Sequence, residues 1–347
     1  MNRTKAFIAC ITVSLTGIAV SGCASASEAA GDDCGEHTIK IGHAIATTSP
    51  LQVGAEEFQS IIEEETDGRL TVEIFPASQL GSETDMIEQV RSGALDIVLA
   101  SPAVISNTYP DAAILAMPFV IDGDSEAEQY VSLQTAAASD VVAEMTEEMA
   151  AEQGMRPVDW TWWYGNRHIT NGVRAIESVD DLAGLKLRTP DAPIHFLALE
   201  ALGASVTPLA FNELYLALQT GTVDGQENPA STIETTKLYE VQDYLAVTGH
   251  MTQAEIALFS ESIWQTLCAA DQEAITSALQ AAGQVQSEIA IAENAAALDR
   301  LEEAGMQITV LDQADLRAAT EGAAEKWAAD NPGFSLERYE AFVAAQS

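Results

Sequence analysis

Basic residues are scarce in this chain of 347 residues, which has 15 Lys and Arg against 53 Asp and Glu and a formal net charge of −38. Binding to nucleic acid needs a basic surface that displaces counterions, and this composition argues against one. An anionic membrane surface would also repel so acidic a protein. Because 47% of the residues are hydrophobic, the chain can still bury a core. The acidity fits either solvation in a saline medium, which we favour, or a field that attracts a cationic ligand.

Long apolar stretches are also missing, except near the start of the chain. Arg3 and Lys5 precede an apolar run over residues 6–20, which is too short to span a bilayer. This pattern is typical of a secretory signal peptide. The run ends in an aliphatic residue, two small residues and Cys23, which resembles a bacterial lipobox. The resemblance implies that residues 1–22 are a lipoprotein signal peptide and that Cys23 carries the lipid.

The alternative is an ordinary signal peptide that is cleaved a few residues later, near residues 24–26. Residues 23–37 are small and polar at their start and are predicted to form a flexible tether. No other stretch reaches 18 uninterrupted apolar residues, so the sequence predicts contact with the membrane only through the lipid anchor.

Cysteine is rare as well, with 4 residues in the chain. Cys10 lies in the signal segment and Cys23 is the predicted lipidation site, which leaves Cys34 and Cys268. In an oxidising compartment these two could form one disulfide, but the sequence alone leaves the pairing open. Neither belongs to a Cys-x-x-Cys pair, so no zinc site is predicted.

The common catalytic motifs are absent. The chain has no phosphate-binding G-x-x-x-x-G-K-[ST], no H-E-x-x-H, no G-x-S-x-G and no G-x-G-x-x-G. Its five His residues do not cluster at the spacing of metal ligands. The sequence therefore predicts no enzyme, no catalytic residue, no metal and no cofactor.

The hydrophobic pattern predicts an α/β fold. Segments in which every second residue is apolar alternate with segments in which apolar residues recur at helical spacing. This alternation of strands and helices implies a largely parallel sheet covered by helices. A second α/β unit follows after residue 184. Residues 271–304 predict one long helix of about 50 Å at ~1.5 Å per residue, long enough to lie across two domains. The first unit comprises strands at 38–43, 70–75 and 95–100, with helices at 51–65 and 82–91. Ser82, with Asp85 three residues later, resembles the N-cap of the second helix.

The few basic residues gather in one part of the sequence. Arg167, Arg174, Lys186 and Arg188 fall close together, and Lys186 and Arg188 share one face of a predicted strand. A guanidinium group matches a carboxylate through two parallel hydrogen bonds, and α/β sheets bind ligands at the carboxyl ends of their strands. Pairing with the abundant surface acids is the alternative, and spacing alone does not decide between them.

Several stretches of the chain together match the pattern of one family. They are YGNRHITN (164–171), DLAGLKLRTP (181–190), ALGASVTPLAFNELYLALQTGTVDGQENP (201–229) and KLYEVQDYLAVTGH (237–250). In these stretches the sequence resembles the solute-binding subunit of a tripartite ATP-independent periplasmic (TRAP) transporter, of the dicarboxylate-receptor (DctP) type. The resemblance implies a two-domain periplasmic-binding-protein fold, class II-like, with a hinge and a long helix spanning both domains.

The resemblance also implies a division into domains. Domain I is expected to comprise residues 38–164 plus about 254–293. Domain II is expected to comprise residues 165–253 plus about 294–347. The chain would cross between the domains near Tyr164, in the 250s and in the 290s.

The resemblance assigns ligand-binding roles to matching positions. Arg188 would form the salt bridge to a ligand carboxylate, and Arg167 would lie on the same wall of the cleft. Phe211 would pack on the ligand, and Asn228 would form a hydrogen bond with it. The implied partners are a small organic carboxylate and the membrane permease subunits of a TRAP transporter.

Some positions depart from the family pattern. Sialic-acid receptors carry a Glu and an Arg where this chain has Ser101 and Val104, which predicts against sialic acid. Tyr164 follows an indole-rich segment that ends in Trp163. That segment could pack in the core and hinge, or it could line the site as a stacking wall or an aromatic cage for an ammonium group. His43 is expected to approach the ligand from the first loop.

Taken together, the sequence predicts a receptor on the periplasmic or extracellular face that delivers a small organic carboxylate to a permease. One alternative is a receptor for a zwitterionic compatible solute of the ectoine or betaine type. A more remote alternative is a lipid-anchored enzyme that acts on a carboxylate.

Overall fold

The computed structural model describes residues 34–346. The predicted signal peptide (1–22), the lipidation site Cys23 and the tether up to residue 33 lie outside the described residues. None of the helices between residues 34 and 346 combines the length and the apolar character needed to cross a bilayer.

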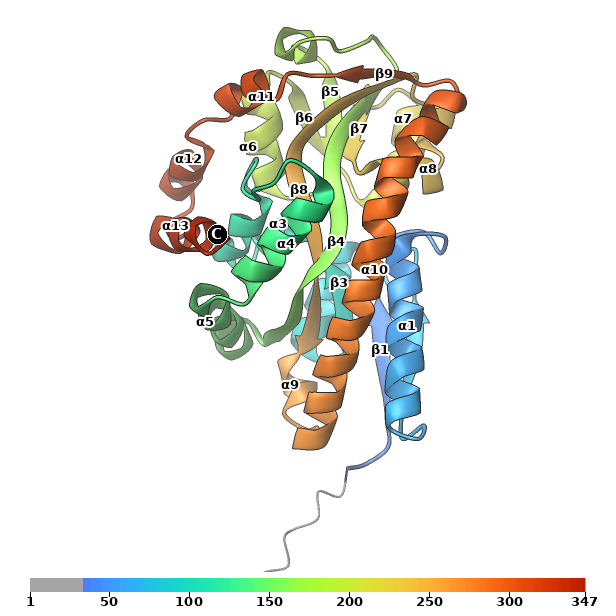
Figure 1. The fold of residues 1–347 in the computed structure, drawn as a ribbon, viewed down its shortest axis with the longest axis vertical. Coiled ribbons are helices and arrows are strands. Elements are labelled where there is room, and N and C mark those ends of the chain that lie inside the picture. Colours follow the sequence, from blue (N-terminus) through green and yellow to red (C-terminus); the bar gives the residue numbers. More distant parts are fainter. Residues whose placement is uncertain (1–33, 347) are drawn as a thin grey trace, which may run out of the picture. The chain divides into compact units, whose positions relative to one another are not determined.

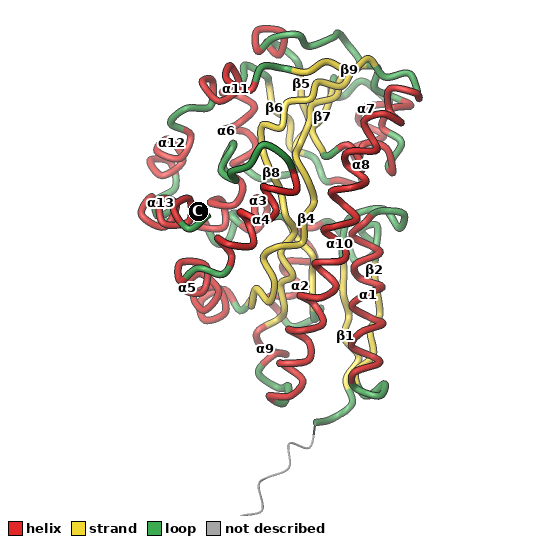
Figure 2. Tube along the Cα trace, viewed as in Figure 1, coloured by secondary structure: helices red, strands yellow, loops and turns green. Residues whose placement is uncertain are grey.

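The described chain forms one mixed sheet with helices packed on both of its sides (Figure 2). Its strands are β1 (His37–Gly42), β2 (Leu70–Phe75), β3 (Ile97–Ala100), β4 (Met155–Asn171), β5 (Lys186–Thr189), β6 (Ser205–Pro208), β7 (Gly225–Asn228), β8 (Tyr244–Ser260) and β9 (Gln307–Val310).

The α-helices alternate with these strands. They are α1 (Pro50–Glu65), α2 (Glu83–Ser92), α3 (Pro102–Ile105), α4 (Glu126–Ala137), α5 (Asp140–Glu148), α6 (Pro193–Ala201), α7 (Leu214–Gln219), α8 (Ala230–Thr235), α9 (Glu261–Trp264), α10 (Ala269–Glu303), α11 (Gln313–Ala319), α12 (Ala323–Asp330) and α13 (Leu336–Ala344). Short 3-10 helices are η1 (Pro110–Ala116), η3 (Val179–Leu182), η4 (Phe211–Glu213) and η5 (Leu238–Glu240), and η2 (Met149–Gln153) is a π-helix.

The sheet order is β2-β1-β3-β8-β4-β7-β5-β6, and β9 pairs with β8. Parallel pairs occur at both ends of this order, as in β1–β2 and β5–β6. The prediction of a largely parallel sheet is wrong at the centre, where β4 and β8, each 17 residues long, run antiparallel to each other. Because these two central strands are antiparallel, they do not need the crossover helix that joins a parallel pair. Figure 1 shows them side by side.

We call the half of the chain built on β1, β2 and β3 the first lobe, and the half built on β5, β6 and β7 the second lobe. The two lobes share β4 and β8, and they also share α10 (Figure 1). In the first lobe α10 packs on α1 so closely that a Cβ at Gly54 would lie 2.6 Å from Gln286. Near the second lobe Asn294 of α10 accepts a 3.2 Å hydrogen bond from the backbone of Ser231 in α8. The predicted long helix across both domains is therefore confirmed.

The N-terminal end of the described chain is fixed to the first lobe. Cys34 and Cys268 form a disulfide, with their Cα atoms 5.6 Å apart. His37 begins β1, and its Nε2 lies 2.5 Å from Asp96 Oδ1. The predicted tether over residues 23–37 is therefore too long at its C-terminal end, because residues 34–37 are held by a covalent bond and a strand.

The C-terminal helices also correct the sequence-based division. Trp327, Phe334 and Phe342 are buried in the same hydrophobic core as the strands of the first lobe. Arg338 on α13 forms ion pairs with Asp111 and Glu148, with nitrogen–oxygen distances of 2.7 and 2.5 Å. Helix α13 therefore packs on the first lobe, whereas the sequence assigned its residues to domain II. The other domain boundaries stay predictions.

Helix α2 is fixed in place at both of its ends. Ser82 and Asp85 form a capping box at its start, as the sequence predicts. The helix ends at Gly93, whose left-handed φ of 76° suits a residue without a side chain. The N-terminal cap determines where the chain enters the helix and so determines the position of Glu83, its first residue.

Candidate functional site

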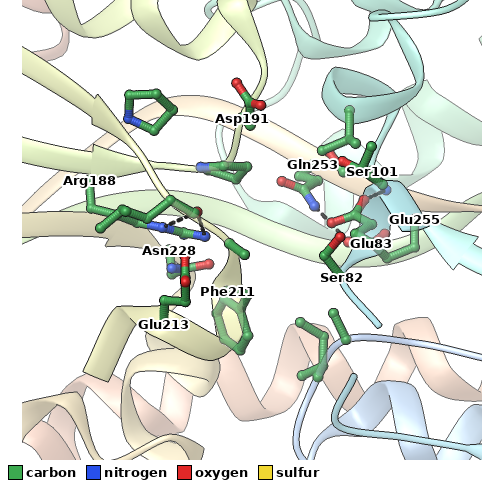
Figure 3. Close-up of a pocket in the computed structure, with 18 of the residues that line it drawn as sticks. Ser82, Glu83, Ser101, Arg188, Asp191, Phe211, Glu213, Asn228, Gln253 and Glu255 are labelled. Carbon is green, nitrogen blue, oxygen red and sulfur yellow. Dashed lines mark hydrogen bonds between the residues drawn. The ribbon is translucent and has the colours of Figure 1, made fainter. Parts of the chain in front are cut away.

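A cavity of about 410 Å³ lies between elements of the two lobes (Figure 3). This volume falls in the usual range for small-molecule sites. The first lobe contributes the start of α2 and the β3–α3 junction. The second lobe contributes β5, the segment after β6 and the end of β7. The shared strands β4 and β8 complete the lining with Tyr164, Arg167, Gln253 and Glu255.

Arg188 lines this cavity from β5 and is 1% exposed. Its Nε and Nη2 donate hydrogen bonds to the backbone oxygen of Leu209, at 3.0 and 2.6 Å. Its Nη1 is buried and has no hydrogen-bond partner among residues 34–346. Burial lowers the pKa of Arg188, but a guanidinium group remains charged at neutral pH. The cavity therefore contains a fixed cation with an unused donor.

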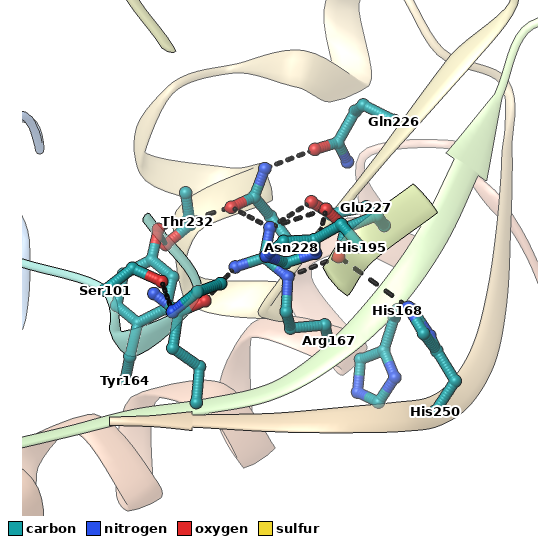
Figure 4. Close-up of polar contacts among 12 residues, drawn as sticks. Ser101, Tyr164, Arg167, His168, His195, Gln226, Glu227, Asn228, Thr232 and His250 are labelled. Atoms are coloured by element: carbon teal, nitrogen blue, oxygen red, sulfur yellow. Dashed lines mark hydrogen bonds and ion pairs between the residues drawn. The ribbon is translucent and has the colours of Figure 1, made fainter. Parts of the chain in front are cut away.

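Arg167 lines the same cavity from β4 but is fully engaged (Figure 4). Its Nη2 donates to the carboxylate and the backbone oxygen of Glu227, at 2.8 and 2.6 Å, and its Nε donates to the same carboxylate. Its Nη1 donates to Gln253 Oε1 at 2.5 Å. Burial lowers the pKa of Arg167, but the charge of Glu227 outweighs it and leaves the pKa raised.

Glu227 joins Arg167 to a group of buried histidines that the sequence did not single out. Its carboxylate lies 3.5 Å from His195 Nδ1 and 3.7 Å from His250 Nε2 (Figure 4). His168 lies beside His250 and is also buried. Burial lowers the pKa of both His168 and His195 to about 3, so both are neutral at pH 7. Glu227 therefore relies on Arg167 for its counter-charge.

Asn228, Tyr164 and Phe211 complete the end of the cavity near the arginines. The Tyr164 hydroxyl donates to Asn228 Oδ1 at 3.3 Å and accepts from Thr232 at 2.8 Å. The Phe211 ring lies 5.7 Å from the guanidinium carbon of Arg188, within the range of a cation–π contact. These contacts hold an amide and an aromatic face beside the free donor of Arg188.

Glu83 and Glu255 line the other side of the cavity, and neither was predicted from the sequence. Glu83 accepts a 2.6 Å hydrogen bond from the backbone of Ser101, and Glu255 accepts a 2.6 Å bond from Gln253. Glu83 belongs to no catalytic motif, and Glu255 lies within a strand, so neither stood out among 53 acids. The capping box at the start of α2 was the one signal that could have drawn attention to Glu83.

The structure brings six of the eight predicted site residues to the cavity. They are Arg188, Arg167, Asn228, Phe211, Ser101 and Tyr164. Of the other two basic residues in the cluster, Arg174 donates to the backbone oxygens of Asp181 and Ala183, and Lys186 is exposed. The shared strand face therefore does not give Lys186 and Arg188 the same environment.

Trp163 and His43 do not line the cavity, which corrects their place in the predicted site. Trp163 is fully buried, donates to Glu126 at 2.8 Å and packs edge-on against Tyr130. Its side chain therefore belongs to the hydrophobic core. His43 is also fully buried and shares a 2.9 Å hydrogen bond with Gln52 of α1, so its imidazole is used inside the first lobe.

Residues 41–331 match the DctP family, described as bacterial extracellular solute-binding protein, family 7. The chain belongs to the DctP family, whose members are the solute-binding proteins of TRAP transporters. Sequence relatives support this. The sialic acid-binding periplasmic protein SiaP of Vibrio cholerae is 34% identical over 282 residues, which cover 81% of this chain and 85% of SiaP. The protein y4mM of Sinorhizobium fredii is 36% identical over 83% of this chain, which spans about half (52%) of that relative's length.

Solved DctP-family structures share the fold. A TRAP periplasmic solute-binding protein from Polaromonas sp. JS666, bound to D-erythronate, is 33% identical and matches with a TM-score of 0.81. The match covers 89% of this chain and 99% of the Polaromonas chain. The two-domain α/β fold expected from the sequence is therefore confirmed.

Proposed function

We propose that this DctP-family protein binds a small organic acid through one carboxylate, held by Arg188, and delivers it to the membrane permease of a TRAP transporter. One observation carries the proposal. The guanidinium of Arg188 is buried against the cavity, and its Nη1 has no hydrogen-bond partner among the described residues. A buried donor without a partner is costly, and a ligand carboxylate would satisfy it.

The charges around the cavity support a ligand with one carboxylate at this end. Glu227 balances the charge of Arg167. Of the two arginines, Arg188 is therefore the one that has no counter-ion among the described residues. A carboxylate at Arg188 would also lie beside the amide of Asn228 and the ring of Phe211, as expected from the sequence. Bonds formed there would be strong, because a site closed to water has a low effective dielectric constant.

The Polaromonas relative is bound to D-erythronate, and we propose small hydroxy acids of this kind as ligands. Sialic acid, which SiaP binds, fits less well. The Glu and Arg expected in sialic-acid receptors are replaced here by Ser101 and Val104, and both line the cavity. Attachment through Cys23 and docking on a permease remain part of the proposal. We propose no catalytic role.

The proposal is tested by calorimetric titration of the purified protein with aldonates and simple hydroxy acids of three to six carbons. We expect at least one to bind, and Arg188→Ala to weaken it by roughly 30-fold or more, since removing one partner of a buried ionic contact costs about 2–5 kcal/mol. Lys186→Ala is the matched control on the same strand, because Lys186 is exposed. Equal affinity in wild type and Arg188→Ala would show that the anchor lies elsewhere.

A further inference from the structure

Anchoring a carboxylate at Arg188 leaves one part of the cavity unexplained. Glu83 and Glu255 line it from α2 and β8, and Figure 3 shows both on the side away from Arg188, Phe211 and Asn228. We call these two residues the carboxyl wall. An acidic surface is an unusual neighbour for a ligand that is itself an anion.

The carboxyl wall is held in place by neutral donors. Glu83 Oε1 accepts the backbone N–H of Ser101, and Glu255 Oε1 accepts the side-chain amide of Gln253. Gln253 is in turn oriented by Arg167, which donates to its oxygen. Each carboxyl group thus uses one oxygen within the protein, and the second oxygen of each has no hydrogen-bond partner among the described residues. The wall therefore presents unused acceptors.

No cation neutralises the carboxyl wall at short range. Among residues 34–346, neither Glu83 nor Glu255 forms an ion pair with Lys, Arg or His, and Arg167, which lines the same cavity, is bound to Glu227. Glu255 is 4% exposed. Burial raises the pKa of Glu83, and burial together with the charge of Glu83 raises the pKa of Glu255. Two such groups together hold less than two negative charges near neutrality.

We infer that the carboxyl wall selects organic acids that carry hydrogen-bond donors at the end away from their carboxylate, and that it rejects acids with a second carboxylate there. This inference rests on the proposed function, because it assumes that one carboxylate occupies Arg188. A hydroxyl or ammonium group would satisfy the unused acceptors of Glu83 and Glu255. A second carboxylate would be repelled by the negative charge that the pair keeps, and it has no donor to offer to the wall's acceptors. A plain alkyl end would leave them unsatisfied.

The test uses acids that differ only at the distal end, at two chain lengths. The four-carbon series is D-erythronate, 4-amino-4-deoxy-D-erythronate, 4-deoxy-D-erythronate, which ends in a methyl group, and meso-tartrate. The six-carbon series is D-galactonate, 6-amino-6-deoxy-D-galactonate, 6-deoxy-D-galactonate and galactarate. Titration calorimetry of the wild-type protein should show that an acid of one length with a distal hydroxyl or amino group binds roughly 10-fold or more tighter than the methyl-ended acid and the diacid of that length. Preference for the hydroxy acid assigns a hydroxyl as the donor, and preference for the amino acid assigns an ammonium group.

The variant Glu83→Gln/Glu255→Gln keeps the shape of the wall and removes its charge. We expect it to lose most of its preference for the donor-bearing acid and to bind the diacid roughly 10-fold tighter than the wild type does. Glu88→Gln is the matched control, because Glu88 is an exposed acid on the same helix as Glu83 and does not line the cavity. Its selectivity should equal that of the wild type. Thermal unfolding reports whether each variant is folded, and the two single variants replace the double variant if it is not.

Two kinds of failure can be told apart. If the wild type binds monocarboxylates with no preference at the distal end, or if the variant keeps the wild-type preference, the carboxyl wall is not the selectivity element. The anchoring role of Arg188 would survive that result. If the wild type binds none of the acids in either series, the proposed function fails and this inference fails with it.

Discussion

Arg167 and Arg188 offer a comparison within one cavity. Both line it and both are 1% exposed, yet the protein treats their charges in opposite ways. Arg167 donates to Glu227, Asn228 and Gln253, and its pKa is raised. Arg188 donates to one backbone oxygen, has a free Nη1, and its pKa is lowered by burial.

The difference shows that burial alone does not tell a structural arginine from a binding one. What separates them is whether the fold supplies the counter-charge. Arg167 has its anion in Glu227, so removing it would strand a buried carboxylate. Arg188 has no counter-ion among the described residues, so the carboxylate of a bound ligand can serve as its counter-ion. A substitution at Arg167 should therefore mainly lower the stability of the protein, whereas one at Arg188 should mainly weaken ligand binding.

The largest effect is expected from Arg167→Met. Removing one partner of a buried ion pair costs about 3–5 kcal/mol, because the remaining charge is left without compensation. Urea unfolding should therefore show a free energy of unfolding lower by that amount. The double variant Arg167→Met/Glu227→Gln is the control and should recover much of the loss. A single variant as stable as the wild type would mean that the Arg167–Glu227 pair is not what holds this part of the sheet.

Arg188→Met should produce the reverse pattern. Its loss removes a buried charge that has no counter-ion among residues 34–346, so the unfolding free energy of the ligand-free protein should fall by less than about 1 kcal/mol, or rise. Binding of the acid identified by titration should weaken by about 2–5 kcal/mol. Urea unfolding and calorimetry on the same preparation give both values. A large loss of stability without ligand would place Arg188 in the same class as Arg167.

The histidines beside Glu227 sharpen the comparison through pH. Burial lowers the pKa of His195 to about 3, whereas an unfolded His titrates near its usual 6.5. As the pH falls below 6.5, the unfolded chain takes up a proton that the folded protein does not. Folding therefore loses about 1.4 kcal/mol per pH unit from this group until about pH 3.

The variant His195→Gln should remove that contribution and flatten the fall of stability between about pH 6 and 4.5. His37→Gln is the control, and its effect on the pH dependence of stability should have the opposite sign. The hydrogen bond between His37 and Asp96 raises the pKa of His37. The stability that His37 contributes is present below pH 6.5 and is lost as the pH rises through its raised pKa. A slope in His195→Gln equal to that of the wild type would contradict the account of His195.

The smallest effect is expected from Phe211→Leu. The ring lies 5.7 Å from the Arg188 guanidinium carbon, and such contacts contribute about 0.5–1 kcal/mol at partly exposed sites. Acid binding should weaken roughly two- to fivefold, with little change in unfolding. Leu214→Ala offers a contrast in the neighbouring helix, because Leu214 is buried in the core and should affect stability instead. A loss of binding as large as that of Arg188→Met would mean that Phe211 contacts the ligand more extensively than its ring position indicates.

The sequence predicted the local elements well where short-range chemistry determines them. The capping box at Ser82 and Asp85 places the start of α2, and the apolar spacing around Ile275 places the long helix. The central strands were harder, because β4 and β8 are buried along most of their length and lack the alternation that marks a half-buried strand. The antiparallel centre of the sheet was missed for that reason.

The cavity was only partly predictable for a similar reason. Arg167 and Arg188 stand out in a chain with so few cations, and the family resemblance assigned them roles. Glu83 and Glu255 could not be chosen from among 53 acids, since their environment arises only when α2, β3 and β8 come together. Trp163 was equally ambiguous, because an indole that donates to Glu126 in the core has the same sequence signature as one that faces a ligand.

The disulfide between Cys34 and Cys268 has a mechanical consequence. Any force applied to the chain before Cys34 can pass through the covalent bond into the first turn of α10. Strand β1 is thereby shielded, and its hydrogen bonds to β2 do not have to resist the pull. Because α10 is packed on α1 and reaches the second lobe, the load would be spread along a helix that contacts both lobes. A pull on the N-terminal end would therefore be carried by α10 and not by the β1–β2 ladder.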